Sequence, residues 1–402
     1  MTLRELLSAW NQFWFGPTTA AVQALIRIAA GLLVCETLIL LVGQDLLDWY
    51  GYRAIVTPES IKQFWWQGAP HFDLLLFLPH NDGAVLAFFW VFLIAAIFMT
   101  IGLQTRWSTL IVALGLISFN NQMPFNVNGG DEMLRFIVLY LVFSECGAVI
   151  SADRLIRRFK HPMLGVNSAA PSVPIFGQRL IQVQMALAYG ATTITKLSGA
   201  EWLDGSAVYY ALRLEQLCRF SIPFLTDNLL ANKALSLLTL IVEGSMCTLV
   251  WIRDLRYWVL ASAVALHLSI DVFMNLPVFQ WVFITGLISF VYPDDLSDLM
   301  NRFKSWISLR YGPPSAVIYN PAIARHLSWA SVLEGIDIFG RLRMEPTEGV
   351  QRLTTVRKND KITGMRLIAF LAPKLPLLWP IYPLMLLSLM AIDRGNAPAS
   401  AN

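Results

Sequence analysis

Charged residues are scarce in this chain. Only 14% of its 402 residues are Asp, Glu, Lys or Arg, whereas 56% are hydrophobic and the mean hydropathy is +0.55. A soluble globular domain carries about 25% charged residues, so water is not the main solvent of this chain. Its basic residues form short clusters at the ends of apolar runs. The net charge of +3 therefore marks membrane topology, and no nucleic-acid partner is expected.

Cysteine is also rare, and its spacing does not favour redox or metal chemistry. None of the four cysteines forms a C-x-x-C pair, and three of them lie inside apolar runs, where a thiol behaves as a small hydrophobic group. They are Cys35, Cys146, Cys218 and Cys247. Neither a disulfide framework nor a metal site is predicted.

The sequence contains several long runs of apolar residues. A run of about 20 such residues is long enough to cross a bilayer as a helix. An all-α polytopic membrane bundle of about eight transmembrane helices is predicted, at about Ala20–Val42, Ala84–Leu103, Trp107–Phe119, Leu134–Ile150, Gly177–Thr195, Ala234–Ile252, Tyr257–Phe273 and Val278–Tyr292. The first 20 residues lack the short apolar core and A-x-A site of a cleaved signal, so the first run is expected to be a retained anchor.

The basic clusters orient these helices. With the N-terminus in the cytoplasm, every tight Lys/Arg cluster falls in an inner loop, as the positive-inside rule requires. The outer loops are then Gly43–Gly83, Asn120–Asp131 and Lys196–Lys233. The lipid bilayer is thus the main partner, and the compact loops favour a bacterial inner membrane.

The composition changes at Tyr311–Pro314, where the sequence reads YGPP. A small α/β unit is predicted beyond it, with a strand at Ala316–Tyr319, a helix at Ala322–Ile336 and a second strand at Gly340–Met344. The chain is therefore predicted to hold two domains, residues 1–300 and residues 311–402.

A last apolar stretch, Met365–Ile392, is interrupted by four prolines. Each proline ring removes a helix hydrogen bond. A membrane-surface or re-entrant segment is therefore preferred to a straight ninth span.

A lysine stands where the fifth predicted span leaves the membrane. Lys196 is followed within nine residues by Glu201, Trp202, Asp204 and Gly205. A lysine at a helix end commonly snorkels toward the lipid headgroups. A lysine partly desolvated in a pocket walled by Trp202 would instead have its ammonium form disfavoured and approach general-base use. Both interpretations stay open.

Two further ionisable groups lie deep in apolar runs. His267 shares a helical face with Asp271, four residues on, so the carboxylate is expected to orient the imidazole. The alternative is an interhelical hydrogen bond of His267 that fixes packing. Glu243, in the sixth predicted span, must face the bundle interior or a wet cavity.

Arginines inside apolar runs also require partners. Arg27 and Arg135 are costly there unless they are paired, and Asp131 or Glu132 would serve Arg135 in a structural role. The polar outer stretch Asn120–Asp131 is either the floor of a cavity or an ordinary turn.

Several weak motifs in order resemble a known family. They are Lys196-Leu197 with Glu201-Trp202 and Gly205, Glu243, His267 with Asn275, and Gly130-Asp131, Leu134-Arg135 and Ser151-Ala152-Asp153. Over about residues 10–300 the chain resembles the HTTM domain, the membrane domain similar to vitamin K-dependent gamma-carboxylase. The resemblance implies that Lys196 is the base that deprotonates a vitamin K-like quinol and that His267 lies near the same site.

On this resemblance, an outer-facing cavity binds a lipophilic quinone-like cofactor. Lys196 and His267 are its expected catalytic residues, and the expected cofactor-binding residues are Trp202, Glu243, Asp271 and Asn121. The carboxylases carry a further histidine where this chain reads Asn120-Asn121-Gln122, and a large lumenal domain without a counterpart in this sequence. Two functions therefore stand side by side. One is a carboxylase-like lyase or quinol epoxidase relative, and the other is a non-catalytic partner in the maturation or export of a secreted peptide.

The C-terminal unit resembles a second family, the thiol-oxidoreductase-like DCC domains. Their Tyr-Asp-Gly-x-Cys-x-x-Cys start reads here as Tyr319-Asn320-Pro321-Ala322-Ile323-Ala324-Arg325-His326. Ile323 and His326 replace both cysteines, and a disulfide exchange needs two sulfurs. The resemblance implies a degenerate thioredoxin-like unit that serves as an interaction module.

Overall fold

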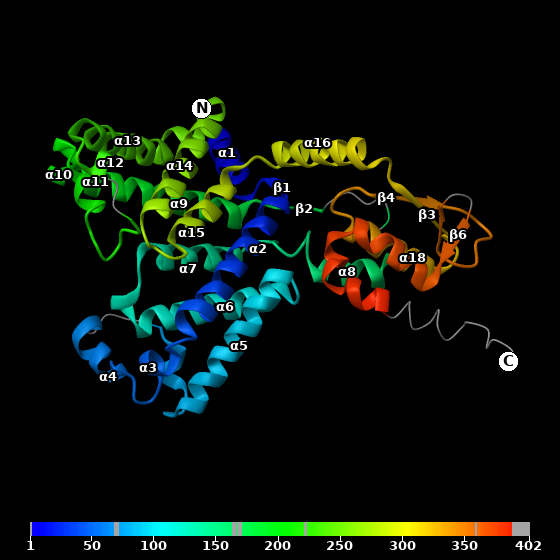
Figure 1. The fold of residues 1–402 in the computed structure, drawn as a ribbon, viewed down its shortest axis with the longest axis horizontal. Coiled ribbons are helices and arrows are strands. Elements are labelled where there is room, and N and C mark those ends of the chain that lie inside the picture. Colours follow the sequence, from blue (N-terminus) through cyan, green and yellow to red (C-terminus); the bar gives the residue numbers. More distant parts are fainter. Residues whose placement is uncertain are drawn as a thin grey trace. The chain divides into compact units, whose positions relative to one another are not determined.

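The structure, a computed structural model, describes residues 2–67, 72–162, 166, 171–220, 223–357 and 360–387. The described chain is mostly helical with a small C-terminal sheet (Figure 1). It divides into two compact units. Unit 1 comprises Met1–Val149 and Pro171–Tyr292, and unit 2 comprises Ile150–Ala170 and Pro293–Asn402.

Unit 1 is a helical bundle. Its longer helices are α1 (Leu3–Phe15), α2 (Ala21–Glu36) continued by the π-helix η1 (Thr37–Val42), α5 (Asp82–Ile101), α6 (Thr105–Gln122), α7 (Gly129–Leu141), α9 (Phe176–Leu197), α13 (Leu229–Cys247), α14 (Arg253–Phe273) and α15 (Phe279–Leu287). Its shorter elements are β1 (Pro17–Thr19), α3 (Leu46–Tyr50), α4 (Pro58–Ile61), η2 (Lys62–Trp66), η3 (Leu74–Phe77), η4 (Pro124–Asn126), β2 (Ser172–Pro174), α10 (Ala200–Asp204), α11 (Ala207–Ala211), α12 (Pro223–Thr226), η6 (Leu249–Trp251) and η7 (Ile288–Phe290). The strands β1 and β2 pair antiparallel.

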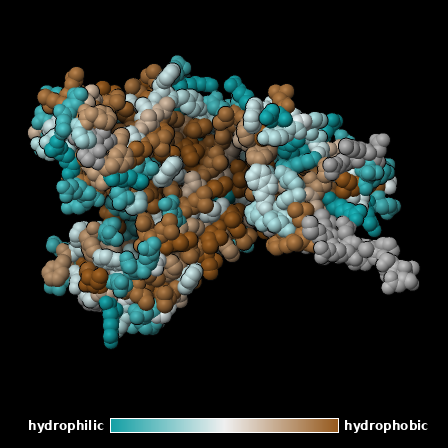
Figure 2. Space-filling model, viewed as in Figure 1, coloured by the Kyte–Doolittle hydropathy of each residue, from teal (hydrophilic) through white to brown (hydrophobic). Residues whose placement is uncertain are grey.

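Helices form in all the predicted apolar runs, but the prediction of eight spans is only partly supported. Four helices of the described chain are long and apolar enough to cross a membrane, namely Ala21–Val42, Asp82–Ile101, Leu229–Cys247 and Arg253–Phe273. Figure 2 shows hydrophobic side chains gathered across the middle of the visible face of unit 1. Such a surface is compatible with contact with lipid tails, because apolar side chains are more stable in the hydrocarbon core of a bilayer than in water.

The other predicted spans are shorter or more polar. The prediction extended one helix from Leu134 to Ile150, whereas α7 ends at Leu141. The Ser144 hydroxyl donates to the Leu141 carbonyl oxygen at 2.8 Å, and turns follow. Apolar composition alone did not predict that the helix ends at Leu141. A serine side chain can satisfy a carbonyl group at a helix end while the hydropathy of the segment stays high.

Small residues allow the helices of unit 1 to approach closely. A Cβ atom added to Gly31 of α2 would lie 2.3 Å from Thr100 Oγ1 of α5. A Cβ atom added to Gly115 of α6 would lie 2.7 Å from the Phe92 ring. Helices in membranes associate through such close packing because apolar burial alone gives no driving force in lipid.

The two arginines in apolar runs have partners. Arg27 of α2 is fully buried, and its Nη1 donates to the Cys146 carbonyl oxygen at 2.9 Å. Arg135 forms an ion pair with Glu132, one of the two acids expected from the sequence. Both contacts lie within unit 1 and are structural.

Unit 2 is a small α/β unit. It contains α8 (Ala152–Lys160), α16 (Pro293–Tyr311), β3 (Ser315–Tyr319), α17 (Ala324–Ile336), β4 (Leu342–Pro346), β5 (Thr354–Arg357), β6 (Asp360–Thr363), α18 (Gly364–Leu371), η8 (Ala372–Lys374) and η9 (Pro376–Ile381). The sheet order is β4-β3-β5-β6, with β3 and β4 parallel and the other neighbours antiparallel. The predicted strand–helix–strand sequence is confirmed, with small shifts at the ends.

The proline-bearing stretch breaks into short helices, as expected. Its first part, however, does not form a membrane-surface segment, because Leu367, Leu371 and Leu375 are buried in a core with Val317 and Leu333. The sequence could not show this, because a leucine-rich face suits a protein core as well as lipid. The end of the predicted stretch, residues 388–392, lies outside the described residues.

The close approach at Gly31 gives a test of the packing. In Gly31→Val, the new side chain must displace Thr100, whose hydroxyl is anchored by donation to the Ala96 carbonyl oxygen at 2.8 Å. We expect the free energy of unfolding to fall by about 1–3 kcal/mol, as in other overpacked sites. Unfolding of the detergent-solubilised protein by sodium dodecyl sulfate measures the change. The control is Leu32→Val, at a neighbouring side chain that is 56% exposed, and equal losses in both variants would contradict the expectation.

Candidate functional site

One face of α9 carries a line of polar side chains. Tyr189, Thr192 and Lys196 follow at spacings of three and four residues, which places them on one side of a helix. This helix packs against α13. The side chains near the C-terminal end of α9 therefore meet those of a candidate membrane span.

Lys196 forms an ion pair with Glu243 of α13. The Lys196 side chain is 22% exposed and the Glu243 side chain 11%. The lysine Nζ also lies 4.8 Å from the centre of the Trp202 ring, within the range of a cation–π contact. The acid that pairs with Lys196 thus comes from a neighbouring helix, and the Trp202 ring borders the ion pair.

A second buried group of side chains surrounds His267. The Tyr189 hydroxyl lies 2.6 Å from His267 Nε2, and His267 Nδ1 lies 2.6 Å from Gln280 Oε1. Because an amide oxygen only accepts, Nδ1 carries the proton and Nε2 accepts from the tyrosine hydroxyl. The Phe283 ring stacks on the imidazole at 5.0 Å between centres. Tyr189, His267 and Gln280 are 3%, 4% and 0% exposed.

Thr192 lies between the two groups. Its Oγ1 is 3.0 Å from the Tyr189 carbonyl oxygen and 3.2 Å from Glu243 Oε2. A hydroxyl carries one proton, so Thr192 donates to either oxygen in turn. The ion pair and the imidazole thus belong to one polar region between α9, α13, α14 and α15.

Two residues predicted for this site lie elsewhere. Asp271 does not orient the imidazole, and its carboxylate lies 4.0 Å from the Arg219 guanidinium. Gln280, from the next helix, occupies the position beside the imidazole that was expected for Asp271. It does so because α15 packs against α14 and brings the Gln280 side chain to the His267 ring. Asn121 donates from Nδ2 to the Phe72 carbonyl oxygen at 2.6 Å and so holds a loop.

Sequence reasoning missed Tyr189, Thr192 and Gln280. The first two were detectable in principle, because they precede Lys196 at helical spacing on one face. Gln280 gave no such signal, because its role depends on how two helices pack.

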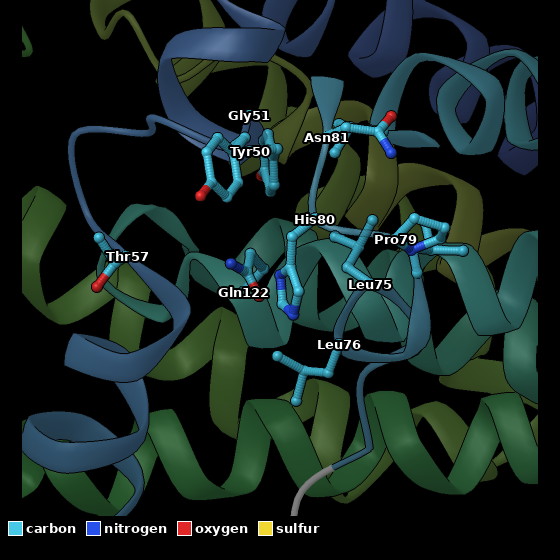
Figure 3. A pocket seen from close by; sticks show the side chains of 12 residues that line it. Tyr50, Gly51, Thr57, Leu75, Leu76, Pro79, His80, Asn81 and Gln122 are labelled. Carbon is cyan, nitrogen blue, oxygen red and sulfur yellow. The ribbon is translucent and has the colours of Figure 1, made fainter. Parts of the chain in front are cut away.

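A separate pocket of about 500 Å³ lies in unit 1, between the segments around Tyr50 and His80 (Figure 3). Tyr50, His80 and Gln122 line it, whereas Lys196, Glu243 and His267 do not. The Gln122 Oε1 atom is buried and has no hydrogen-bond partner in the described part of the chain. Burial, with the nearby charges of Asp131 and Asp73, raises the pKa of the Tyr50 hydroxyl, so this group stays protonated at neutral pH. The Asn120–Asp131 stretch thus contributes Gln122 to the wall of a pocket.

No group of three His, Cys, Asp or Glu side chains suited to a metal ion occurs among the residues that the structure describes. The polar region around Lys196 instead offers one cation, one carboxylate, one imidazole and two hydroxyl groups. Carboxylate, imidazole and hydroxyl groups are the side chains that take part in proton transfer in proteins.

The apolar helices and the buried polar region define a helical membrane protein. A family model described as the HTTM domain matches residues 15–294, and the chain belongs to that family. YitO of Bacillus subtilis (strain 168), described as an uncharacterized protein, is 27% identical over 140 residues. The alignment covers 34% of this chain and 44% of YitO, so the match spans less than half of that relative. No solved structure matches the chain.

The ion pair can be tested by a double-mutant cycle with Lys196→Met, Glu243→Gln and the double variant. Removing one partner leaves a charge in a largely buried place, so each single variant should lose about 3–5 kcal/mol of unfolding free energy. The double variant should lose less than the sum of both. Denaturation of the detergent-solubilised protein, followed by tryptophan fluorescence, gives the loss of unfolding free energy of each of the three variants relative to the wild type.

The matched control is the exposed pair of Arg213 and Asp227, whose side chains are 50% and 63% exposed. Its coupling energy should be about 0–1 kcal/mol. An additive result for Lys196 and Glu243 would show that the two groups do not interact.

Proposed function

We propose that this chain binds a lipophilic molecule with a weakly acidic hydroxyl group, of the quinol class, at the Lys196–Glu243 pair and accepts a proton from it. The observation that carries the proposal is the ion pair itself. It lies between α9 and the candidate span α13 and is continued by buried Tyr189 and His267. Ionisable groups at such places are costly, and their usual reason is a ligand or proton pathway.

The chemistry follows from the two charges. Glu243 receives the proton of the ligand hydroxyl as that O–H bond breaks. Lys196 stays beside the oxygen anion that remains and stabilises it electrostatically. Thr192 and the Tyr189–His267 pair then provide hydroxyl and imidazole groups that can pass the proton onward. If the chain is an enzyme, this step is the one that a carboxylase-like lyase or a quinol epoxidase relative would require first.

We also propose a bacterial inner-membrane location with the N-terminus in the cytoplasm. In Figure 1, α3 and α4 lie at the same end of unit 1 as α10, α11 and α12. Two of the segments expected outside thus share one end, as this topology demands. α6, α7, α9 and α15 would complete the bundle of eight as shorter or more polar spans, sheltered by the four apolar helices.

For the C-terminal unit we propose a degenerate thioredoxin-like interaction module related to the DCC domains. Support comes from the parallel β3–α17–β4 unit followed by the β5–β6 hairpin and α18. Ile323 and His326 stand at the start of α17, where the related motif has its two cysteines. Such a unit binds but does not exchange disulfides.

Quinol binding predicts a ligand-dependent rise in the midpoint of thermal unfolding. A ligand at 100 times its Kd stabilises the folded state by about 2.7 kcal/mol. We expect reduced menaquinone-4 to raise the midpoint for the detergent-solubilised wild type and to lose this effect in Lys196→Met and Glu243→Gln. Lys233→Met, at an exposed lysine of α13, is the control and should respond as the wild type does. An unchanged midpoint in the wild type with quinols of any tail length would refute the proposal.

The orientation predicts which side of the membrane each loop faces. In a variant with all four cysteines replaced by alanine, we expect Glu215→Cys to react with an impermeant maleimide on intact spheroplasts. Asp254→Cys, at the start of α14, should react only after permeabilisation. Both side chains are exposed, so a reversed pattern would mean a reversed topology.

A further inference from the structure

Unit 2 has an open pocket of about 800 Å³ to which no role is assigned. Its walls come from α17, from the loop before β5, and from α18 with the residues after it. The volume is within the range of about 300–1,000 Å³ that is usual for small-molecule sites. It is therefore large enough for a ligand of the size of a long acyl chain.

The walls of this pocket are mainly apolar. Trp329 and Leu333 of α17 face it together with Leu353, Met365, Ile368 and Leu378. The side chains of Trp329, Met365 and Ile368 are 41%, 44% and 36% exposed. These exposed fractions are high for large apolar side chains that lie close together in one small unit. Apolar surface left open in this way is typical of a ligand groove.

The polar groups of the pocket are cationic or donate hydrogen bonds. Arg325 and Arg352 line it, and no Asp or Glu occurs among its described lining residues. His326 is only 9% exposed, and its Nδ1 accepts from the Asn320 backbone N–H at 3.4 Å. Because Nδ1 accepts this bond, Nε2 is the ring nitrogen that can donate to a ligand. A nearly buried imidazole thus lines the same pocket as two arginines.

From these features we infer that this pocket binds a long-chain fatty acid, with its acyl chain between α17 and α18 and its carboxylate at Arg325, Arg352 and His326. The apolar walls match the chain, and the guanidinium groups match a planar carboxylate by paired hydrogen bonds. The inference does not depend on the site at Lys196, because all of these residues belong to unit 2.

Photolabelling tests the inference on the full chain in phosphatidylcholine nanodiscs. Palmitate carrying a diazirine near its tail should label peptides of α17 or α18, as mapped by mass spectrometry. Unlabelled palmitate should compete, and hexadecanol, which lacks the charge, should compete at least about tenfold more weakly, since hydrogen bonds to charged groups contribute about that much. Equal competition by both would refute the carboxylate site.

Two variants and one control separate binding from folding. The double variant Arg325→Gln/Arg352→Gln changes two exposed side chains and should weaken palmitate binding about tenfold or more. Ile368→Glu puts a negative charge into the wall and should abolish labelling. Arg366→Gln changes an arginine of α18 that does not line the pocket and should label as the wild type does. Unchanged labelling in the double variant, or labels confined to unit 1, would overturn the inference.

Discussion

The contact between Lys196 and Glu243 constrains much of unit 1, because two opposite charges in an apolar bundle must stay together. Lys196 lies on α9 and Glu243 on α13, so the ion pair fixes the position of α13 along the axis of α9. Thr192 bonds to the same carboxylate, and one turn earlier the hydroxyl of Tyr189 bonds to His267. The register of one helix pair thus sets the positions of the groups around the imidazole on α14.

The rest of the bundle solves a different problem, since helices in lipid gain little from burying apolar surface. Close packing at Gly31 and Gly115 brings backbones together. The buried guanidinium of Arg27 donates through Nη1 to the backbone carbonyl group of Cys146 and so ties α2 to the segment after α7. Polar groups therefore have two roles in unit 1. Arg27 supports the fold, whereas the charged pair at Lys196 is the group for which we propose a role in ligand binding.

The sequence predicted the features of the fold that depend on composition and on the period of the hydrophobic pattern. Hydropathy located the helices, prolines predicted the breaks after Met365, and the strand–helix–strand pattern of unit 2 is present. It did not predict features that depend on packing between elements. Asp271 has the right spacing for His267, yet Gln280 takes that place because α15 contacts α14. Likewise, hydropathy could not tell that Leu371 lies in a protein core, because lipid and core favour the same side chain.

Unit 2 has an open pocket at the start of α17. Ile323 and His326 lie there and line the pocket, so the start of α17 presents an apolar group and a ring nitrogen. Disulfide exchange needs an accessible thiolate, and accessibility requires an open surface at that end of the helix. No thiol occurs among the described lining residues of the pocket at this end, so its open surface suits an amphiphile and not disulfide exchange. Among the charged groups that line the pocket between α17 and α18, Arg325 and Arg352 therefore determine the sign of charge that the proposed ligand must carry.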